Sequence, residues 1–167
     1  MWHGGKKAEA EREYRTALKM NSALRGVHLA IGLLKMDAGD LNSAEAEFRA
    51  EAQLRPGDAE AAWRLGSVLL QKDQTRPALA ELKRSNSLRP HMIETLFDLG
   101  KASGLENETA AAEKAWLEVI DLDDTGEMAA SSHFQLSQLF RRQGKAAEAN
   151  RQYKRFLELQ PKPPERK

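Results

Sequence analysis

The amino-acid sequence repeats a spaced pair of small residues at a nearly constant interval. A glycine or serine is followed twelve positions later by an alanine four times along the 167 residues. The pairs are Gly32 with Ala44, Gly66 with Ala78, Gly100 with Ala112, and Ser137 with Ala149. Successive pairs begin 34, 34 and 37 residues apart. A period of this length is typical of proteins that stack copies of one supersecondary unit, so we expect a repeat array.

Large apolar residues follow the same interval. One precedes each small residue, at Ile31, Leu65, Leu99 and Leu136, and another follows each alanine by four positions, at Phe48, Leu82, Trp116 and Tyr153. The repeats then close with Leu54-Arg55-Pro56, Leu88-Arg89-Pro90, Leu122-Asp123-Asp124 and Leu159-Gln160-Pro161. We expect each small residue to face its alanine across two closely packed helices, with the large residues interlocking above and below.

Each repeat has the pattern of two helices. From Ala59 to Lys72 apolar residues recur at helical spacing, and a polar break at Asp73-Gln74 follows. A second helix is predicted from about Thr75 to Leu88, with Pro77 in its first turn, where the missing N–H does no harm. Pro90 ends it, because proline cannot continue the hydrogen-bond ladder. Equivalent breaks are marked by Gly39-Asp40 and Gly144.

These residues resemble the tetratricopeptide repeat (TPR), whose pattern is W-x2-L-G-x2-Y, then A-x3-F, then P. The resemblance implies an all-α fold: a right-handed superhelical solenoid of helix pairs whose concave wall is lined by the first helix of each pair. It divides the chain into 1–24 (second helix only), 25–58, 59–92, 93–126, 127–162 and a tail at 163–167, all in one TPR domain.

The sequence departs from the TPR pattern at two kinds of position. Late in the second helix, where the family usually has a small alanine, stand Glu51, Ser85, Val119 and Phe156. Where the pattern prefers tryptophan, stand His28, Ala62, Leu96 and His133. We expect the two histidines to pack in place of an aromatic ring.

No group of residues has the spacing of a catalytic or metal site. The four histidines are scattered, there is no cysteine, and no glycine-rich phosphate loop occurs. Residues 121–126 resemble the start of a calcium loop, but its twelfth residue would be Ser132 instead of the bidentate glutamate. A turn between repeats explains the aspartates better. We therefore expect no enzymatic activity, no metal and no cofactor.

The distribution of charge and hydropathy along the chain indicates which classes of partner to expect. The middle of the chain is acidic and its two ends are basic, unlike the continuous basic stripe of a nucleic-acid binder. No apolar run reaches the roughly 18 residues of a membrane span, so we expect no membrane insertion. The localisation is unknown from the sequence. A cytoplasmic localisation is favoured, because no signal peptide is visible in this chain. The alternative that the chain is a fragment of a longer protein stays open.

The TPR resemblance implies which side chains point into the concave groove. The predicted apolar anchors are Leu29, Leu33, Trp63, Phe97 and Phe134. The predicted polar groups are Arg64, Lys101, Gln138, Arg141 and Arg142. We call these ten residues the inner-face residues. Neither the carboxylate clamp of chaperone-tail binders nor an asparagine ladder is carried over, because no asparagine occupies these positions. The aromatic rings either dock a partner or fill gaps between helices.

The resulting hypothesis is a protein–protein interaction scaffold that binds a peptide or helix of a partner protein in its groove. The partner's identity is not readable from the sequence. The alternative is a self-associating structural spacer, joined as a homodimer through uncapped ends, or a targeting arm of a larger protein or enzyme.

Overall fold

The computed structural model describes residues 3–160, which form nine α-helices and no strand. The helices are α1 (His3–Met20), α2 (Val27–Asp37), α3 (Leu41–Leu54), α4 (Ala59–Gln71), α5 (Thr75–Leu88), α6 (Ile93–Leu105), α7 (Thr109–Leu122), α8 (Glu127–Arg142) and α9 (Ala146–Leu159). The predicted all-α class is confirmed for this part of the chain. The tail predicted at 163–167 lies outside the described residues.

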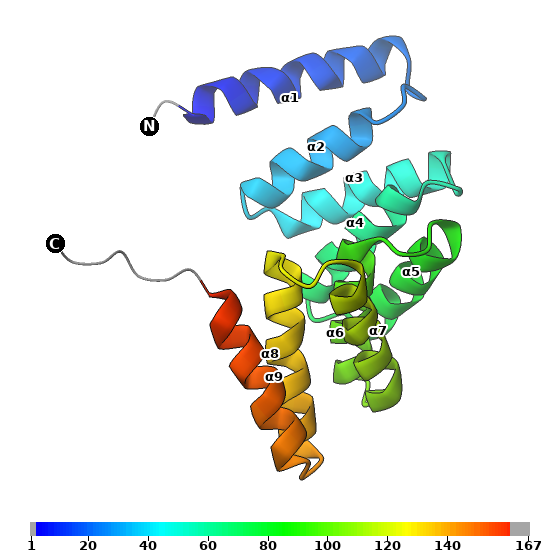
Figure 1. The fold of residues 1–167 in the computed structure, drawn as a ribbon. Helices are drawn as coiled ribbons and strands as arrows, with labels where there is room; N and C mark the ends of the chain where they lie inside the picture. Colours follow the sequence, from blue (N-terminus) through cyan, green and yellow to red (C-terminus); the bar gives the residue numbers. More distant parts are fainter. Residues whose placement is uncertain (1–2, 161–167) are drawn as a thin grey trace, which may run out of the picture. The chain divides into compact units, whose positions relative to one another are not determined.

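The chain divides into two compact units, an N-terminal unit of residues 1–89 and a C-terminal unit of residues 90–167. Within the first, α2 pairs with α3 and α4 with α5; within the second, α6 pairs with α7 and α8 with α9 (Figure 1). These pairs are the helical hairpins expected from the repeat. The helix predicted from Thr75 to Leu88 is α5, and Pro77 lies in its first turn.

Each hairpin turns at a residue with left-handed backbone. These residues, spaced like the repeats, are Gly39 (φ 76°), Asp73 (φ 57°), Asn107 (φ 62°) and Gly144 (φ 74°). The next N–H in each turn donates back to the last helical turn, as Gln74 does to the carbonyl of Leu69 at 2.9 Å. This arrangement ends a helix in a Schellman motif, where glycine fits best and asparagine or aspartate is tolerated.

Missing side chains let the two helices of a hairpin approach closely. A Cβ added to Gly66 would lie 2.7 Å from Cγ of Leu82, and one added to Gly32 or Gly100 would overlap the ring of Phe48 or Trp116. The large residue thus fills the space over the glycine. The predicted approach to the alanine is seen at Gly66, whose added Cβ would also lie 3.3 Å from the carbonyl oxygen of Ala78. The alanines themselves, Ala44, Ala78, Ala112 and Ala149, are buried.

Within the N-terminal unit, ion pairs join helix α1 to α2. None of its side chains from Lys6 onward is buried. Lys7 pairs with Asp37, and the carboxylate of Glu11 lies 2.8 Å from Nζ of Lys35. The hydrogen bond from Lys35 holds the pKa of Glu11 below its ordinary value. Protonation of Glu11 removes the charge that pairs with Lys35. We therefore expect the docking of α1 to depend on pH, although each exposed ion pair stabilises weakly.

The glycine contact predicts opposite effects for two substitutions in α6. Gly100→Ala should lower the free energy of unfolding by about 1 to 3 kcal/mol, because the new methyl group overlaps the indole of Trp116. Gly104→Ala is the matched control, since its Cβ would meet Trp116 at an ordinary 3.4 Å. It should be neutral or stabilising by up to about 1 kcal/mol from helix propensity. Denaturant unfolding measures both, and equal effects would contradict the packing described.

The ion pairs predict that acid releases α1. The lowered pKa of Glu11 means that its contribution is present above the unfolded value of 4.5 and is lost as the pH falls through the lower folded value. Glu11→Gln should reduce hydrogen-exchange protection of α1 at neutral pH roughly two- to five-fold, the size of a surface pair. Glu9→Gln, which removes an exposed charge from the same helix, should not. Unchanged protection in Glu11→Gln would refute this attachment.

Candidate functional site

In the N-terminal unit, the inner-face residues lie on the first helices α2 and α4. Leu29 and Leu33 on α2, and Trp63 and Arg64 on α4, are all half-buried. The guanidinium carbon of Arg64 lies 4.1 Å from the centre of the Trp63 ring, and Nη2 of Arg64 lies 3.5 Å from Oε1 of Glu60. Stacking on the indole orients the guanidinium of Arg64. Its N–H groups point outward in the plane of the guanidinium, where they can donate to other acceptors.

In the C-terminal unit, both predicted aromatic anchors take part in packing. Phe97, which is half-buried, packs against the core cluster that contains Trp116, and its carbonyl accepts a hydrogen bond from Nε1 of Trp116 at 3.3 Å. The Phe134 ring lies 5.1 Å, centre to centre, from the Phe156 ring of α9. Their contacts show the gap-filling role that the sequence left open. A docking role for their remaining exposed edges stays a prediction.

A pocket of about 210 Å³ lies among α6, α7 and α8. We call it the α6–α8 pocket; its lining is Lys101, Gly104, Leu105, Trp116, Gln135 and Arg142. It brings together two of the predicted basic residues, Lys101 and Arg142, which are separated in the sequence by a whole repeat. Apolar surface and a few polar groups that converge are the usual composition of a ligand site.

The α6–α8 pocket is positively charged. Its lining carries two basic side chains and no acidic one. Nζ of Lys101 lies 4.0 Å from Oδ1 of Asp98, at the limit of an ion pair, and 5.9 Å from the centre of the Phe97 ring. Arg142, at the exposed end of α8, forms no ion pair within residues 3–160. The pocket can therefore accept an acidic group above its apolar lining.

Besides Phe134, two other inner-face residues of α8 do not line this pocket. Arg141 has its guanidinium carbon 5.6 Å from the centre of the Tyr153 ring, on the side of α9. Gln138 is half-buried on α8. The pocket includes instead Gly104, Leu105, Trp116 and Gln135, which the predicted site lacks.

One sequence signal could have located this pocket. Gly104 follows Gly100 by one helical turn, so α6 presents two glycines in succession to the indole of Trp116. Gly104 contributes no side chain at this place, and the indole of Trp116, which is 2% exposed, forms part of the pocket lining.

The histidines and the aspartate turn have structural roles. Nδ1 of His28 lies 2.7 Å from Oε2 of Glu47, and Nδ1 of His133 lies 2.5 Å from Oε1 of Gln152. Each contact joins the first helix of a hairpin to the second, so these histidines pack as expected. Oδ1 of Asp123 accepts hydrogen bonds from the N–H groups of Thr125 and Gly126 and thereby forms the turn between repeats. These bonds lower the pKa of Asp123.

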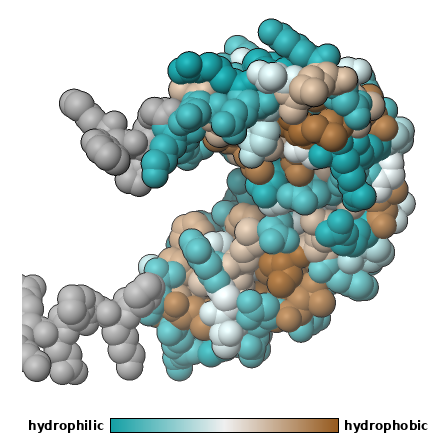
Figure 2. All heavy atoms as spheres, turned by 90° about the horizontal axis from the view of Figure 1, so that it is seen from above, coloured by the Kyte–Doolittle hydropathy of each residue, from teal (hydrophilic) through white to brown (hydrophobic). Residues whose placement is uncertain are grey.

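Metal-binding and membrane-spanning features were sought in the same part of the chain. Between residues 3 and 160, no three histidine or acidic side chains come close enough together to hold a metal ion. None of the helices there combines the length and the apolar character needed to cross a membrane. The space-filling view agrees with the polar composition: on the face shown, hydrophobic patches are separated by hydrophilic surface (Figure 2).

Solved structures with the same fold include proteins of several kinds. A structure of MamA is 24% identical with a TM-score of 0.84, over 93% of this chain and 90% of that one. YrrB, described as a TPR protein with an unusual peptide-binding site, is 18% identical with a TM-score of 0.81, over 94% and 79%. PilF of Pseudomonas aeruginosa is 17% identical with a TM-score of 0.81, over 95% and 71%. At these identities the likeness shows the fold alone.

Comparison with curated proteins gives no match. Sequence models of the tetratricopeptide repeat match residues 29–86 and 130–163, which together make up more than half of the chain. The hairpins, their spacing and the glycine contacts agree with that assignment. The chain belongs to the tetratricopeptide repeat family.

Proposed function

We propose that this protein is a non-catalytic scaffold that binds a segment of a partner protein on the inner-face residues. The TPR fold is typical of protein–protein interaction, and TPR proteins bind protein or peptide partners. The observation that carries the proposal is the α6–α8 pocket, where Lys101 and Arg142 flank an apolar lining. A site of this composition selects a peptide by both shape and charge.

The pocket's size and charge define the partner segment. A volume of about 210 Å³ is small compared with the pockets that hold whole drug-sized ligands, so it fits a side chain of an extended peptide or helix. Trp116 and Leu105 supply the apolar contact. Lys101 and Arg142 supply charge-assisted hydrogen bonds, which favour a carboxylate. We therefore propose that the segment carries an acidic residue next to an apolar one.

The N-terminal unit offers a second contact of the same kind. Leu29 and Leu33 supply apolar surface on α2, and Trp63 with its stacked Arg64 supplies an aromatic and cationic surface on α4. Tryptophan and arginine are the residues most enriched among binding hot spots. We propose that this surface also contacts the partner.

A selection of random peptides on the intact protein tests the charge of the pocket. The peptides that bind should be enriched in aspartate or glutamate beside an apolar residue. Arg142→Ala and Lys101→Ala should each weaken such a peptide about five- to tenfold, the loss of one charge-assisted hydrogen bond. Arg151→Ala is the matched control, because it removes an exposed arginine from α9. Peptides without acidic residues, or equal affinity for all variants, would contradict the proposal.

The contact on the N-terminal unit is tested by Trp63→Ala. This change should weaken binding of a partner or a long selected peptide by about 1 to 3 kcal/mol, the range of an aromatic hot spot. Leu54→Ala serves as the control, since it shortens an exposed apolar side chain of α3. Calorimetry measures affinity, and circular dichroism checks folding. Full affinity in a folded Trp63→Ala protein would confine binding to the C-terminal unit.

A further inference from the structure

A second pocket, remote in sequence from the α6–α8 pocket, lies where the loops of the N-terminal unit meet. Its volume is about 250 Å³. Three arginines line it, Arg25, Arg55 and Arg89, together with Leu88 and the backbone around residues 57–59. The single acidic side chain of the lining is Asp58. We call it the arginine pocket.

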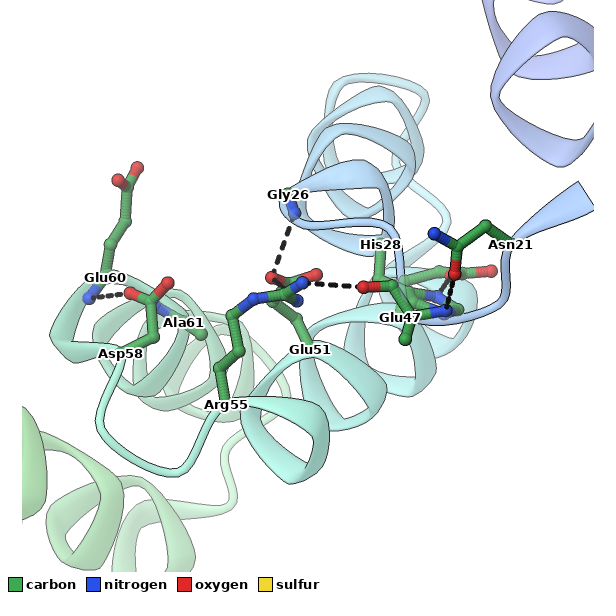
Figure 3. A network of polar contacts seen from close by, with 10 residues as sticks. Asn21, Gly26, His28, Glu47, Glu51, Arg55, Asp58, Glu60 and Ala61 are labelled. Carbon is green, nitrogen blue, oxygen red and sulfur yellow. Dashed lines mark hydrogen bonds and ion pairs between the residues drawn. The ribbon is translucent and has the colours of Figure 1, made fainter. Parts of the chain in front are cut away.

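Arg55, one of the three arginines, is held in place by two hydrogen bonds within the protein. Nη1 of Arg55 donates to Oε1 of Glu51 at 2.6 Å, and Nη2 donates to the carbonyl of Ala23 at 2.8 Å (Figure 3). Glu51 is fully buried, and the same Oε1 accepts the N–H of Gly26 at 3.1 Å. A guanidinium has five N–H donors, so three remain after these two bonds. Arg55 is thus oriented before any ligand arrives.

Glu51 stands where the TPR pattern has a small alanine. A buried carboxylate costs free energy unless a cation and hydrogen bonds compensate it. Here it accepts hydrogen bonds from Arg55 and from the backbone of Gly26, at the start of α2. The glutamate at this position therefore affects the surface, because its hydrogen bond orients Arg55 in the lining of the arginine pocket.

The positive charges of the arginine pocket outnumber the negative ones in its lining. Arg25 and Arg89 are exposed, and neither forms an ion pair in the described part of the chain. Asp58 already uses Oδ1 to cap α4, where it accepts from the N–H groups of Glu60 and Ala61 at 2.9 and 3.2 Å. The N–H groups at the start of α4 are thereby occupied. The attraction for an anion comes from the arginines.

We propose that the arginine pocket binds a phosphate-type oxyanion. Three arginines from three separate segments line one pocket, and its lining includes a single carboxylate, that of Asp58. Guanidinium groups match the oxygens of phosphate in a bidentate manner, and a doubly charged anion relieves their mutual repulsion. The proposal is independent of the α6–α8 pocket, because the two pockets share no residue.

The next repeat carries the opposite charge at one of these arginine positions. Arg55 and Arg89 occupy the same place in two Leu-Arg-Pro closings. The corresponding residue of the next repeat is Asp123, whose carboxylate caps the turn at Thr125 and Gly126. A carboxylate at that place repels an oxyanion.

The experiment titrates the intact protein with inorganic pyrophosphate, inorganic phosphate and acetate at constant ionic strength, followed by calorimetry and by arginine Nε resonances. Pyrophosphate should bind most tightly and acetate least. Arg25→Ala and Arg89→Ala should each weaken pyrophosphate about tenfold, and Arg151→Ala should leave it unchanged. Asp58→Asn, which keeps a capping side chain, should strengthen binding about two- to five-fold. Arg55 is left intact, because its loss would strand the buried Glu51.

A phosphoserine-containing peptide of otherwise neutral sequence distinguishes the sources of the phosphate. Tighter binding than inorganic phosphate, lost in Arg25→Ala, indicates a phosphorylated partner; equal binding indicates the free ion. Either result supports the pocket. Affinity for pyrophosphate that is insensitive to Arg25 and Arg89, or that falls equally with Arg151→Ala, would overturn it, as would acetate binding as tightly as pyrophosphate.

Discussion

The contact between a glycine of the first helix and a large residue of the second determines the geometry of each of the first three complete repeats. The ring of Phe48 or Trp116, or the side chain of Leu82, occupies the space that a Cβ on Gly32, Gly100 or Gly66 would need. This close approach fixes the rotation of the first helix against the second. Once that rotation is fixed, the remaining faces of the first helix are fixed as well. The inner-face residues are one consequence.

The same hairpin geometry produces two different recognition surfaces. On α6 and α8, Lys101 and Arg142 line one pocket with the indole that the glycine contact holds in place. Between hairpins, Glu51 near the end of α3 accepts a hydrogen bond from the N–H of Gly26 at the start of α2. The same carboxylate oxygen accepts from Arg55, which lines the arginine pocket together with Arg25 and Arg89. One surface combines apolar and cationic groups, and the other combines three arginines with a single carboxylate.

The regular part of this structure could be predicted from the sequence because it repeats. The limits of α5, its proline and the break after α4 followed from local pattern, and the family followed from the 34-residue spacing. The large residue was not predicted to be the nearest contact of each glycine. Spacing shows which residues recur, but which of two recurring residues fills a gap depends on the rotation of the helices in three dimensions.

The candidate sites were predicted only in part, for a similar reason. Lys101 and Arg142 were among the inner-face residues, but that they line one pocket with Gly104 and Trp116 depends on how α6, α7 and α8 pack. Glu51 was recognised as a departure from the pattern. Its effect on Arg55 could not be predicted, because it depends on a backbone N–H at Gly26 that is 25 residues away in the sequence.

The most direct test of the central claim uses the indole N–H of Trp116, which donates to the carbonyl of Phe97 beside the α6–α8 pocket. Its resonance should be followed by nuclear magnetic resonance while an acidic, partly apolar peptide is added. If the peptide occupies the α6–α8 pocket, this signal shifts in proportion to the bound fraction, and it shifts several-fold less in the Arg142→Ala protein at the same subsaturating concentration. A peptide that binds while the Trp116 signal remains unmoved in the unsubstituted protein would contradict the account.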